Sequence, residues 1–336
     1  MNKKSLRWQL PFLLFLLIGS YFILTKKRPY YVEEGMIYGT VYKITYQHRE
    51  SLKGSIEEEL QRVNKSLSTF DSTSTISMIN YNKNLEVDVM FKDVFLLSEE
   101  ISKLTDGAFD ITVAPLVNIW GFGFQKAKEL TPTQIDSIRQ FVGYQKVSLK
   151  NDKIEKQDPR IMLDCSSIAK GYAVDCIARL LERQGVTNYM VDIGGELRVS
   201  GISEKNVAWK IGINKPIDDS LSIKQELYAV LDITNCGMAT SGNYRNFYYK
   251  EGKKYAHTID PRTGYPIQHN ILSATVVAAD CATADAYATA FMVLGLDASK
   301  KICANKPEIE AFFIYSDSKG RMQTYSTPGM KKYVAR

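Results

Sequence analysis

Apolar residues return at helical spacing in several stretches of the chain. Within residues 56–67 and again within 94–104 they recur every three or four positions, which places them on one face of a helix. Ser55 and Glu58 have the spacing of a capping box, so the first of these helices is expected to begin there. The run T-P-T-Q at residues 131–134 puts a proline at a first helical position and predicts another helix start.

Shorter stretches rich in β-branched and aromatic residues predict strands. The longest is M-I-Y-G-T-V-Y-K-I-T-Y, residues 36–46. Further strands are expected at 161–164, 189–193, 209–213, 226–234, 273–278 and 311–315, and hairpins at 147–155 and 248–259. Two more helices are expected, one from about Ser166 to Gly185 and one that Asp280 caps and that ends near Leu294.

These elements follow one another without regular strand–helix alternation. No linker rich in Pro, Gly or Ser interrupts residues 36–330, and no repeat has a convincing period. A doubly wound sheet requires regular alternation, so the pattern favours an α+β fold. We therefore expect a single large mixed α+β domain over residues 30–336.

The first 29 residues have the pattern of an export signal. Cations at both ends enclose the apolar run W-Q-L-P-F-L-L-F-L-L-I-G-S-Y-F-I-L, residues 8–24. This length is at the lower limit of a membrane-spanning helix, which needs roughly 17–25 residues. No cysteine follows the run as a site of lipid attachment. We expect residues 1–29 to form an apolar helix that serves as a signal peptide or signal anchor, with residues 30–336 outside the cytoplasm.

The charge of the chain is confined to this N-terminal segment. Residues 1–28 contain no acid, and their cations account for the whole net charge of +6, so residues 29–336 are neutral. A neutral body argues against nucleic acid as a partner, because phosphate binding needs clustered cations. The 5 cysteines form no C-x-x-C pair, so neither a zinc site nor a redox pair is indicated, and most are expected in the core.

The stretch D-C-S-S-I-A-K-G-Y-A-V-D, residues 164–175, could bind an anion. An aspartate ends a predicted strand, two serines begin a helix, and Lys170 lies in the first turn. Free N–H groups at a helix N-terminus attract phosphate, and a lysine adds a point charge. The alternative is an ordinary helix cap followed by a solvated lysine.

Two further stretches carry hydroxyl and carboxylate groups. Asp285 and Thr289 stand four apart within D-C-A-T-A-D-A-Y-A-T-A, so both lie on one helix face, where they suit a hard cation such as Mg²⁺. The alternative is a polar stripe that faces water. Thr240 and Ser241, which precede Gly242, could hold a phosphate, although a simple turn is the commoner explanation.

The segment H-T-I-D-P-R-T-G-Y-P, residues 257–266, contains one of only 3 histidines. His257 could act as a general base because imidazole titrates near neutral pH, although a lone histidine is more often structural. Asp260 and the Pro and Gly that follow it predict a tight turn. The chain has no P-loop, no Rossmann glycine pattern and no G-x-S-x-G hydrolase motif.

The order of the motifs is more specific than any one of them. Along the chain stand G-T-V-Y (39–42), S-T-F-D (68–71), G-A-F-D-I-T-V-A-P-L-V-N-I-W-G-F-G (107–123), D-C-S-S-I-A-K-G-Y-A-V-D (164–175), V-D-I-G-G-E (191–196), A-T-S-G-N-Y (239–244), H-T-I-D-P-R-T-G-Y-P (257–266) and the 280–290 stretch. Over about residues 36–330 this series strongly resembles the FAD:protein FMN transferases of the ApbE type. The resemblance implies the α+β fold of that family and a Mg²⁺-dependent reaction on FAD. In that reaction FMN passes to a Thr or Ser hydroxyl of an acceptor protein, and AMP leaves.

The resemblance also implies roles for individual residues. Metal contacts are implied for Ser167, Asp285 and Thr289. Contacts to FAD are implied for Tyr38, Phe70, Ala108, Phe109, Asp110, Asp164, Lys170 and Ile259, and Thr240 and Ser241 are candidates for its phosphates. His257 would accept the proton of the attacking hydroxyl, and Asp260 would orient the turn or the imidazole.

The chain departs from the family pattern at three places. It has C-S-S at residues 165–167 where close relatives often show Gly-Gly or Ser-Thr, and Ala288 where some relatives carry Asp. The metal is therefore expected to have fewer protein ligands and more water. Phe70 occupies a position that is often Tyr, so it can stack but lacks the hydroxyl.

Two other functions would use the same residues. One is a Mg²⁺-dependent FAD pyrophosphatase, in which water replaces the acceptor hydroxyl, and the other is a non-catalytic flavin carrier. Family acceptors are exported or membrane redox proteins, which agrees with the expected N-terminal anchor. We accordingly expect a protein of the cell envelope, on the periplasmic side of the inner membrane.

Overall fold

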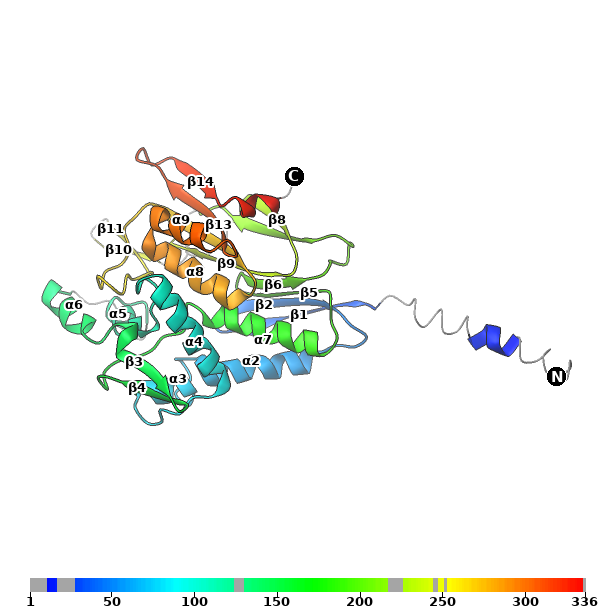
Figure 1. Cartoon of the computed structure of the whole chain (residues 1–336), viewed down its shortest axis with the longest axis horizontal. Helices are drawn as coiled ribbons and strands as arrows, with labels where there is room; N and C mark the ends of the chain where they lie inside the picture. The colour runs from blue at the N-terminus through cyan, green and yellow to red at the C-terminus, as the bar shows by residue number, and fades with distance from the viewer. Residues whose placement is uncertain are drawn as a thin grey trace.

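The computed structural model describes residues 11–16, 28–123, 130–216, 226–243, 247–250 and 253–334 (Figure 1). An eight-stranded sheet runs through the molecule in the order β1-β2-β5-β6-β9-β12-β13-β14, and all neighbouring strands are antiparallel. Its strands are β1 (Tyr30–Ile37), β2 (Thr40–Gln47), β5 (Tyr189–Ile193), β6 (Glu196–Ser200), β9 (Cys236–Gly242), β12 (Ile271–Ala278), β13 (Glu310–Ser316) and β14 (Met322–Ser326).

Shorter elements surround this sheet. In the described part of the chain, two-stranded sheets form from β3 (Val147–Lys150) with β4 (Lys153–Lys156), β7 (Trp209–Asn214) with β8 (Leu227–Ile233), and β10 (Phe247–Lys250) with β11 (Lys253–Ala256). The labelled α-helices are α2 (Lys53–Leu67), α3 (Thr75–Asn80), α4 (Val89–Leu104), α5 (Ala114–Ile119), α6 (Pro132–Arg139), α7 (Ala169–Arg183), α8 (Cys281–Leu294) and α9 (Leu296–Asn305). Single 3₁₀ turns are η1 (Ile111–Val113), η2 (Tyr144–Lys146) and η3 (Gly329–Lys332).

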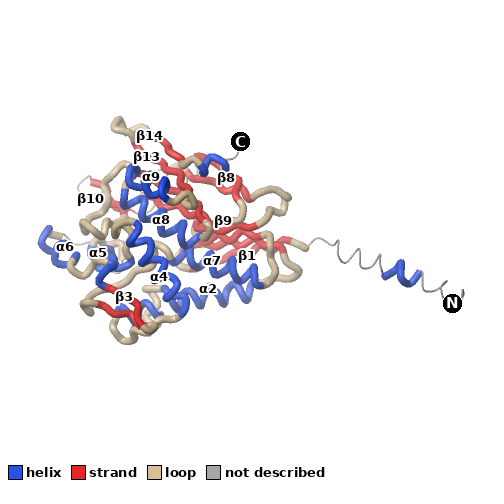
Figure 2. The backbone as a smooth tube through the Cα atoms, in the orientation of Figure 1, coloured by secondary structure: helices blue, strands red, loops and turns tan. Residues whose placement is uncertain are grey.

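The large sheet separates two layers of apolar packing. Helices α7 and α8 pack on one face, and α2 and α4 pack against these two helices, so most of the core lies on this side (Figure 2). The β7–β8 sheet covers part of the other face. Along β6, Glu196 and Arg198 form ion pairs with α7, whereas Leu197 and Val199 are buried in the cluster shared with β7 and β8. This division follows from the alternation of side chains along a strand.

The predicted single α+β domain is confirmed, and so are several local signals. Thr131 and Gln134 form the capping box of α6, with the proline at its start. The side chain of Asp280 accepts a hydrogen bond from Thr283 N at the beginning of α8. Asn151 and Asp152 adopt positive φ angles of 49° and 56° in the β3–β4 turn, a conformation that these residues tolerate well.

Two predicted elements near the N-terminus were wrong in detail. Residues 36–46 form parts of a hairpin, because Tyr38 and Gly39 take φ angles of 52° and 74° and reverse the chain between β1 and β2. The capping box of Ser55 and Glu58 does not form. The N-cap is Leu52 in place of Ser55, and its side chain makes no cap, so α2 begins at Lys53.

Other corrections concern the second half of the chain. Residues 161–164 belong to no strand. Leu163 N donates to the side chain of Asn80 at the end of α3, and Asp164 N donates to Ile111 O in η1, so these groups are not available for a strand ladder. Residues 239–242 lie inside β9, and the expected turn is absent there. Strands β6, β9 and β14 and helices α3, α5 and α9 have no counterpart among the predicted elements.

The predicted N-terminal apolar helix is only partly within the described structure. Residues 11–16 are helical and exposed, whereas 1–10 and 17–27 lie outside the described residues. Among the residues searched, no helix is both long and apolar enough to cross a membrane. The prediction that most cysteines lie in the core is confirmed, since all five are buried. None of them forms a disulfide.

Candidate functional site

A cavity of about 790 Å³ lies where the first turn of α7 and the later turns of α8 approach β5, β6 and β9. It brings together most of the residues selected from the sequence. The predicted residues that line it are Phe70, Ala108, Phe109, Asp110, Asp164, Ser167, Lys170, Thr240, Ser241, His257, Ile259, Asp285 and Thr289. These residues come from distant parts of the chain, and the fold brings them to one cavity.

The segment that leads into α7 forms one wall of the cavity. Asp164 Oδ1 accepts a hydrogen bond from Ser166 N at 2.8 Å, which fixes the turn that precedes the helix. The helix begins at Ala169, and its N-cap residue Ile168 provides no side-chain acceptor. Ser167 and Lys170 therefore lie at the start of this helix, where Ala169 N already donates to Cys165 O and Gly171 N donates to Asp285 Oδ2.

Helix α8 carries the predicted metal ligands on its cavity side. Asp285 Oδ2 accepts a hydrogen bond from Gly171 N at 3.0 Å, and Thr289 Oγ1 lies 3.2 Å from Ser241 Oγ. Thr240 is held by Thr275, with 2.8 Å between their hydroxyl oxygens. Of the two β9 hydroxyls, that of Ser241 thus faces α8, whereas Thr240, the adjacent strand residue, points to the opposite face of the sheet.

Small residues allow α7 and α8 to approach closely at this wall. A Cβ atom on Gly171 would lie 2.5 Å from Cys281 O and 2.8 Å from Asp285 Cβ. Real Cβ atoms do not approach so closely, so position 171 requires glycine. The close approach brings Gly171 N within hydrogen-bonding distance of Asp285 and fixes the direction of that carboxylate.

Glu196 is a cavity residue to which the sequence analysis gave no role. It is the first residue of β6, directly after Gly194 and Gly195, whose φ angles of 69° and 103° make the β5–β6 turn. Glu196 Oε1 lies 2.5 Å from Lys170 Nζ. Its Oε2 atom is buried and has no hydrogen-bond partner in the described structure. The V-D-I-G-G-E motif contained this residue, but only the tertiary fold shows its pairing with Lys170.

The three charged groups of this wall favour an additional cation. Burial and the neighbouring Glu196 raise the pKa of Asp285 to about 8, even though Lys170 opposes the effect. Two buried carboxylates thus share one ammonium group, and one carboxylate oxygen is unsatisfied. Mg²⁺ prefers such oxygen ligands, and it completes its shell with water. The residues present therefore fit a divalent cation.

The set of available ligands is small. The described residues contain no group of three His, Cys, Asp or Glu side chains arranged to hold a metal ion. A cation in this cavity would be held by Asp285 and Thr289, with an oxygen of Ser167 and water.

The 108–110 segment forms a second, more apolar wall. Ala108 and Phe109 are each 1% exposed, so they shape the cavity from within the core. Asp110 accepts hydrogen bonds from Thr112 N, Thr112 Oγ1 and Tyr144 N. Burial raises the pKa of Asp110 against the effect of these donors. Phe70 differs from this group because it is 83% exposed at the rim, where a planar ligand could stack on it.

His257 lies at the cavity directly after β11, and the other histidines, His48 and His269, do not line it. Its ring meets Phe122 edge to face, with 6.3 Å between the ring centroids. Trp120, at the end of α5, holds the turn that follows His257, because its Nε1 donates to Gly264 O at 2.8 Å. Ile259 packs with α5 and α6 in a separate apolar cluster. The histidine is therefore carried by an anchored segment.

Two predicted site residues do not line the cavity. Tyr38 lies in the β1–β2 turn, and its hydroxyl donates to Leu60 O at 2.6 Å. Asp260 accepts hydrogen bonds from Arg262 N, Nε and Nη2, and its carbonyl accepts from Gly264 N. Asp260 thus orients the turn, one of its two expected roles. A contact of Tyr38 with the flavin stays a prediction.

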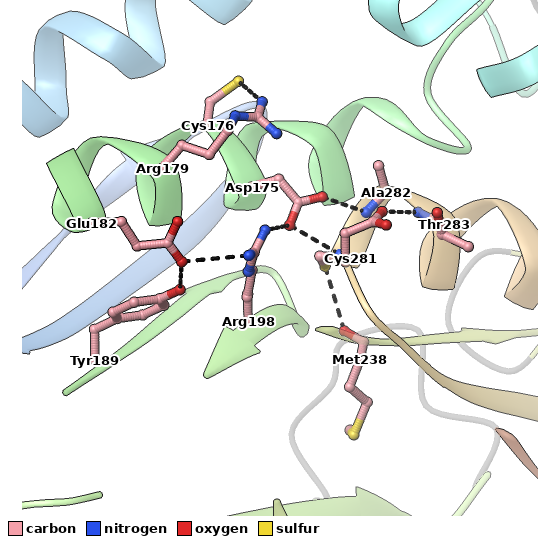
Figure 3. A network of polar contacts seen from close by, with 11 residues as sticks. Asp175, Cys176, Arg179, Glu182, Tyr189, Arg198, Met238, Cys281, Ala282 and Thr283 are labelled. Atoms are coloured by element: carbon pink, nitrogen blue, oxygen red, sulfur yellow. Dashed lines mark hydrogen bonds and ion pairs between the residues drawn. The ribbon is translucent and has the colours of Figure 1, made fainter. Parts of the chain in front are cut away.

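Asp175, five residues after Lys170 on α7, is another buried carboxylate, and it had not been selected from the sequence (Figure 3). Asp175 is 1% exposed and accepts hydrogen bonds from Cys281 N and Ala282 N at the start of α8. Arg198 Nη1 lies 3.0 Å from Asp175 Oδ1. This network joins α7, β6 and α8.

Comparison with known proteins agrees with this architecture. The model of the ApbE family matches residues 38–313, so the chain belongs to the ApbE family. Relatives named FAD:protein FMN transferase include one from Haemophilus influenzae, 37% identical over 89% of this chain and 90% of its own. Another, from Escherichia coli K12, is 34% identical over 90% and 89% of the two chains.

Solved structures give the same result. The flavin transferase ApbE from Vibrio cholerae superposes with a TM-score of 0.82 at 31% identity, covering 91% of this chain and 99% of the other. The apo flavinyl transferase ApbE from Pseudomonas stutzeri gives a TM-score of 0.81 at 31% identity, with coverage of 92% and 98%. The expected fold and family are thereby confirmed.

Proposed function

We propose that this protein transfers FMN from FAD to a Thr or Ser hydroxyl of an acceptor protein, in a Mg²⁺-dependent reaction that releases AMP. The observation that carries the proposal is the convergence of His257, Lys170, Asp285 and Thr289 on one cavity, in a chain whose matched relatives are named FAD:protein FMN transferases. A base, a cation for phosphate and oxygen ligands for a metal are the groups that phosphoryl transfer needs.

The reaction forms one bond and breaks another at the FMN phosphorus. The acceptor oxygen attacks this phosphorus, and the bond between the phosphorus and the bridging pyrophosphate oxygen breaks, so AMP leaves with that oxygen. His257 accepts the proton of the attacking hydroxyl, and Lys170 binds the phosphate oxygens. The rim position of Phe70 supports stacking on a flavin ring.

A bound Mg²⁺ would neutralise charge on the pyrophosphate and its leaving oxygen. Asp285, Thr289 and Ser167 are the residues that would hold it. The chain itself contributes the orientation of this set: Gly171 N fixes Asp285, and Ser241 lies beside Thr289.

We further propose that the enzyme works outside the cytoplasm, on the periplasmic side of the inner membrane. The apolar run at residues 8–24 and its flanking cations support an N-terminal anchor. Acceptors would then be exported or membrane redox proteins. The neutral body of the chain supports a protein partner over nucleic acid.

The first test is an intact-mass measurement on a small acceptor protein incubated with the full chain, FAD and Mg²⁺. A mass gain equal to FMN less water, abolished by EDTA, would establish the transferase. Free FMN and AMP without a mass gain would instead indicate FAD pyrophosphatase activity. Bound FAD without either product would indicate a carrier.

His257→Ala tests the proposed base. We expect the rate of flavinylation to fall roughly 10²–10⁴-fold, the usual contribution of general-base catalysis. FAD affinity should stay within a few-fold of that of the unmodified chain, because His257 acts on the acceptor hydroxyl. His48→Ala, which changes a histidine outside the cavity, is the matched control. Near-normal flavinylation by His257→Ala would remove the base role.

A further inference from the structure

Lys170 interacts with two carboxylates, those of Glu196 and Asp285. Its Nζ atom lies 2.5 Å from Glu196 Oε1, and Asp285 is the next charged neighbour. Although burial alone would lower it, the pKa of Lys170 is raised by Glu196 and Asp285. The Lys170 side chain is 33% exposed toward the cavity, whereas that of Glu196 is only 7% exposed. The lysine can therefore swing into the cavity, but the glutamate is fixed.

Glu196 is incompletely satisfied by this arrangement. Its Oε2 atom is buried and has no partner among the described residues. A buried carboxylate oxygen without a hydrogen bond is costly, and native structures rarely retain one without a functional reason. One ammonium group also leaves one of the two carboxylate charges uncompensated when both are ionised. A group with more positive charge would complete the cluster.

We propose that Glu196 is a further residue that binds the divalent cation. Until the cation and the FAD pyrophosphate bind, Lys170 pairs with Glu196 in place of the cation. On binding, Lys170 moves from Glu196 to the phosphate oxygens, and the cation takes oxygens of Glu196 and Asp285. The movement of Lys170 to the phosphate oxygens rests on the proposed function. The binding of the cation by Glu196 is independent of FAD and is measured without it.

The exchange follows from the chemistry of the partners. Lysine is a point charge on a flexible stem, so it can change partners at little geometric cost. Mg²⁺ and Mn²⁺ are hard cations that accept carboxylate oxygens in place of an ammonium group. Because the nucleotide removes Lys170 from the site of the cation, each ligand should bind more tightly when the other is present.

The test is a Mn²⁺ titration of the full chain in mild detergent without FAD, with free Mn²⁺ measured by electron paramagnetic resonance. We expect Lys170→Met to bind Mn²⁺ roughly ten-fold more tightly, because a competing positive charge is removed. We expect Glu196→Gln to bind it roughly ten-fold more weakly. Lys210→Met is the matched control, since Lys210 also lines the cavity but pairs with Asp232 at 2.7 Å, and it should change affinity less than about two-fold.

The double variant decides whether Lys170 acts through Glu196. In a Glu196→Gln background, Lys170→Met should tighten Mn²⁺ binding by much less than it does alone. Circular dichroism of each variant shows whether it is folded, and the double variant avoids an unpaired buried glutamate. Equal tightening in both backgrounds, or no tightening by Lys170→Met, would overturn the proposal.

Repeating the titration with FAD separates this proposal from the proposed function. Saturating FAD should tighten Mn²⁺ binding to the unmodified chain, and Lys170→Met should lose most of that effect. An unchanged effect of FAD in Lys170→Met would overturn the exchange. A normal set of Mn²⁺ results together with an absence of flavinylation would leave Glu196 as a cation-binding residue and would contradict only the transferase.

Discussion

Two buried carboxylate clusters lie along α7, and they differ in how completely their oxygen atoms are satisfied. Asp175 accepts from two backbone N–H groups of α8 and pairs with Arg198. Five residues earlier, Lys170 pairs with Glu196, whose second oxygen has no partner in the described structure. Both clusters use adjacent helix-facing residues of β6, so the same three elements build a closed network and an open one.

The difference separates support from binding. The Asp175 cluster is closed, because the protein supplies its partners, and it fixes the start of α8 against α7 and β6 (Figure 3). The Glu196 cluster faces the cavity and is incomplete. Fully satisfied buried networks make a structure rigid, whereas an unpaired buried polar group costs stability. Removal of the closed cluster should therefore affect folding, and changes in the open one should affect cation binding.

The largest effect is expected from Asp175→Ala. It leaves Arg198 without its buried partner and two N–H groups of α8 without acceptors. We expect the free energy of unfolding to fall by about 3–5 kcal/mol, as for other broken buried ion pairs. For a chain of this size the melting temperature should fall by about 10 °C. Urea and thermal unfolding of the purified variant measure both quantities.

Asp280→Ala is the matched control for this experiment. Asp280 caps the same helix end through Thr283 N, but it comes from the adjoining loop and is not fully buried. Loss of such a cap costs about 1 kcal/mol. Equal losses in the two variants would mean that Asp175 acts only as a second cap, and the distinction between the clusters would weaken.

Asp285→Asn should produce an intermediate effect that depends on pH. The pKa of Asp285 is raised from 3.8 to about 8, so between these values the folded state keeps a proton that the unfolded state has lost. The metal-free chain therefore loses stability as pH rises through this window, by at most about 1.4 kcal/mol per pH unit for one proton. Asn carries no such charge and can still accept from Gly171 N through its amide oxygen. Its stability relative to the unmodified chain should increase from pH 5 to pH 8.

Calorimetry in EDTA at the two pH values measures this change. Thr289→Val, one turn further along α8, removes a polar group that does not titrate, so its stability relative to the unmodified chain should not vary with pH. If Asp285→Asn behaved like Thr289→Val, the raised pKa of Asp285 would be incorrect. Added Mg²⁺ should reduce the advantage of Asp285→Asn at pH 8, because the cation stabilises the ionised aspartate.

The sequence predicted residues of the open cluster but none of the closed cluster. Lys170 and Asp285 could be selected because each stands in a local motif with a chemical meaning. Glu196 and Asp175 could not, because their roles depend on which strand and helix turns become neighbours. A buried carboxylate and a solvated one have the same letter in the sequence, and only tertiary packing distinguishes them.

The prediction of secondary structure was limited in the same way, because tertiary contacts override local sequence signals. Helices with clear periodicity, such as residues 94–104, and turns with local signals, such as Asn151-Asp152, were predicted correctly. The reversal at Tyr38 was missed because a non-glycine residue with positive φ gives no strong signal. Residues 161–164 have strand composition, but Asn80 and Ile111 take up their backbone groups, so no ladder forms.

The smallest effect is expected from Glu182→Gln, at the outer end of the closed cluster. Glu182 is 43% exposed; Arg198 Nη2 lies 3.4 Å from its Oε1, which also accepts from the Tyr189 hydroxyl at 2.6 Å. Exposed ion pairs contribute about 0–1 kcal/mol, and Gln still accepts from Tyr189, so the loss in urea unfolding should be below about 1 kcal/mol. A loss close to that of Asp175→Ala would show that Glu182, Arg198 and Asp175 stabilise the protein as one unit. The closed cluster would then extend to the surface, and its stability would depend on salt in a way that a fully buried pair does not.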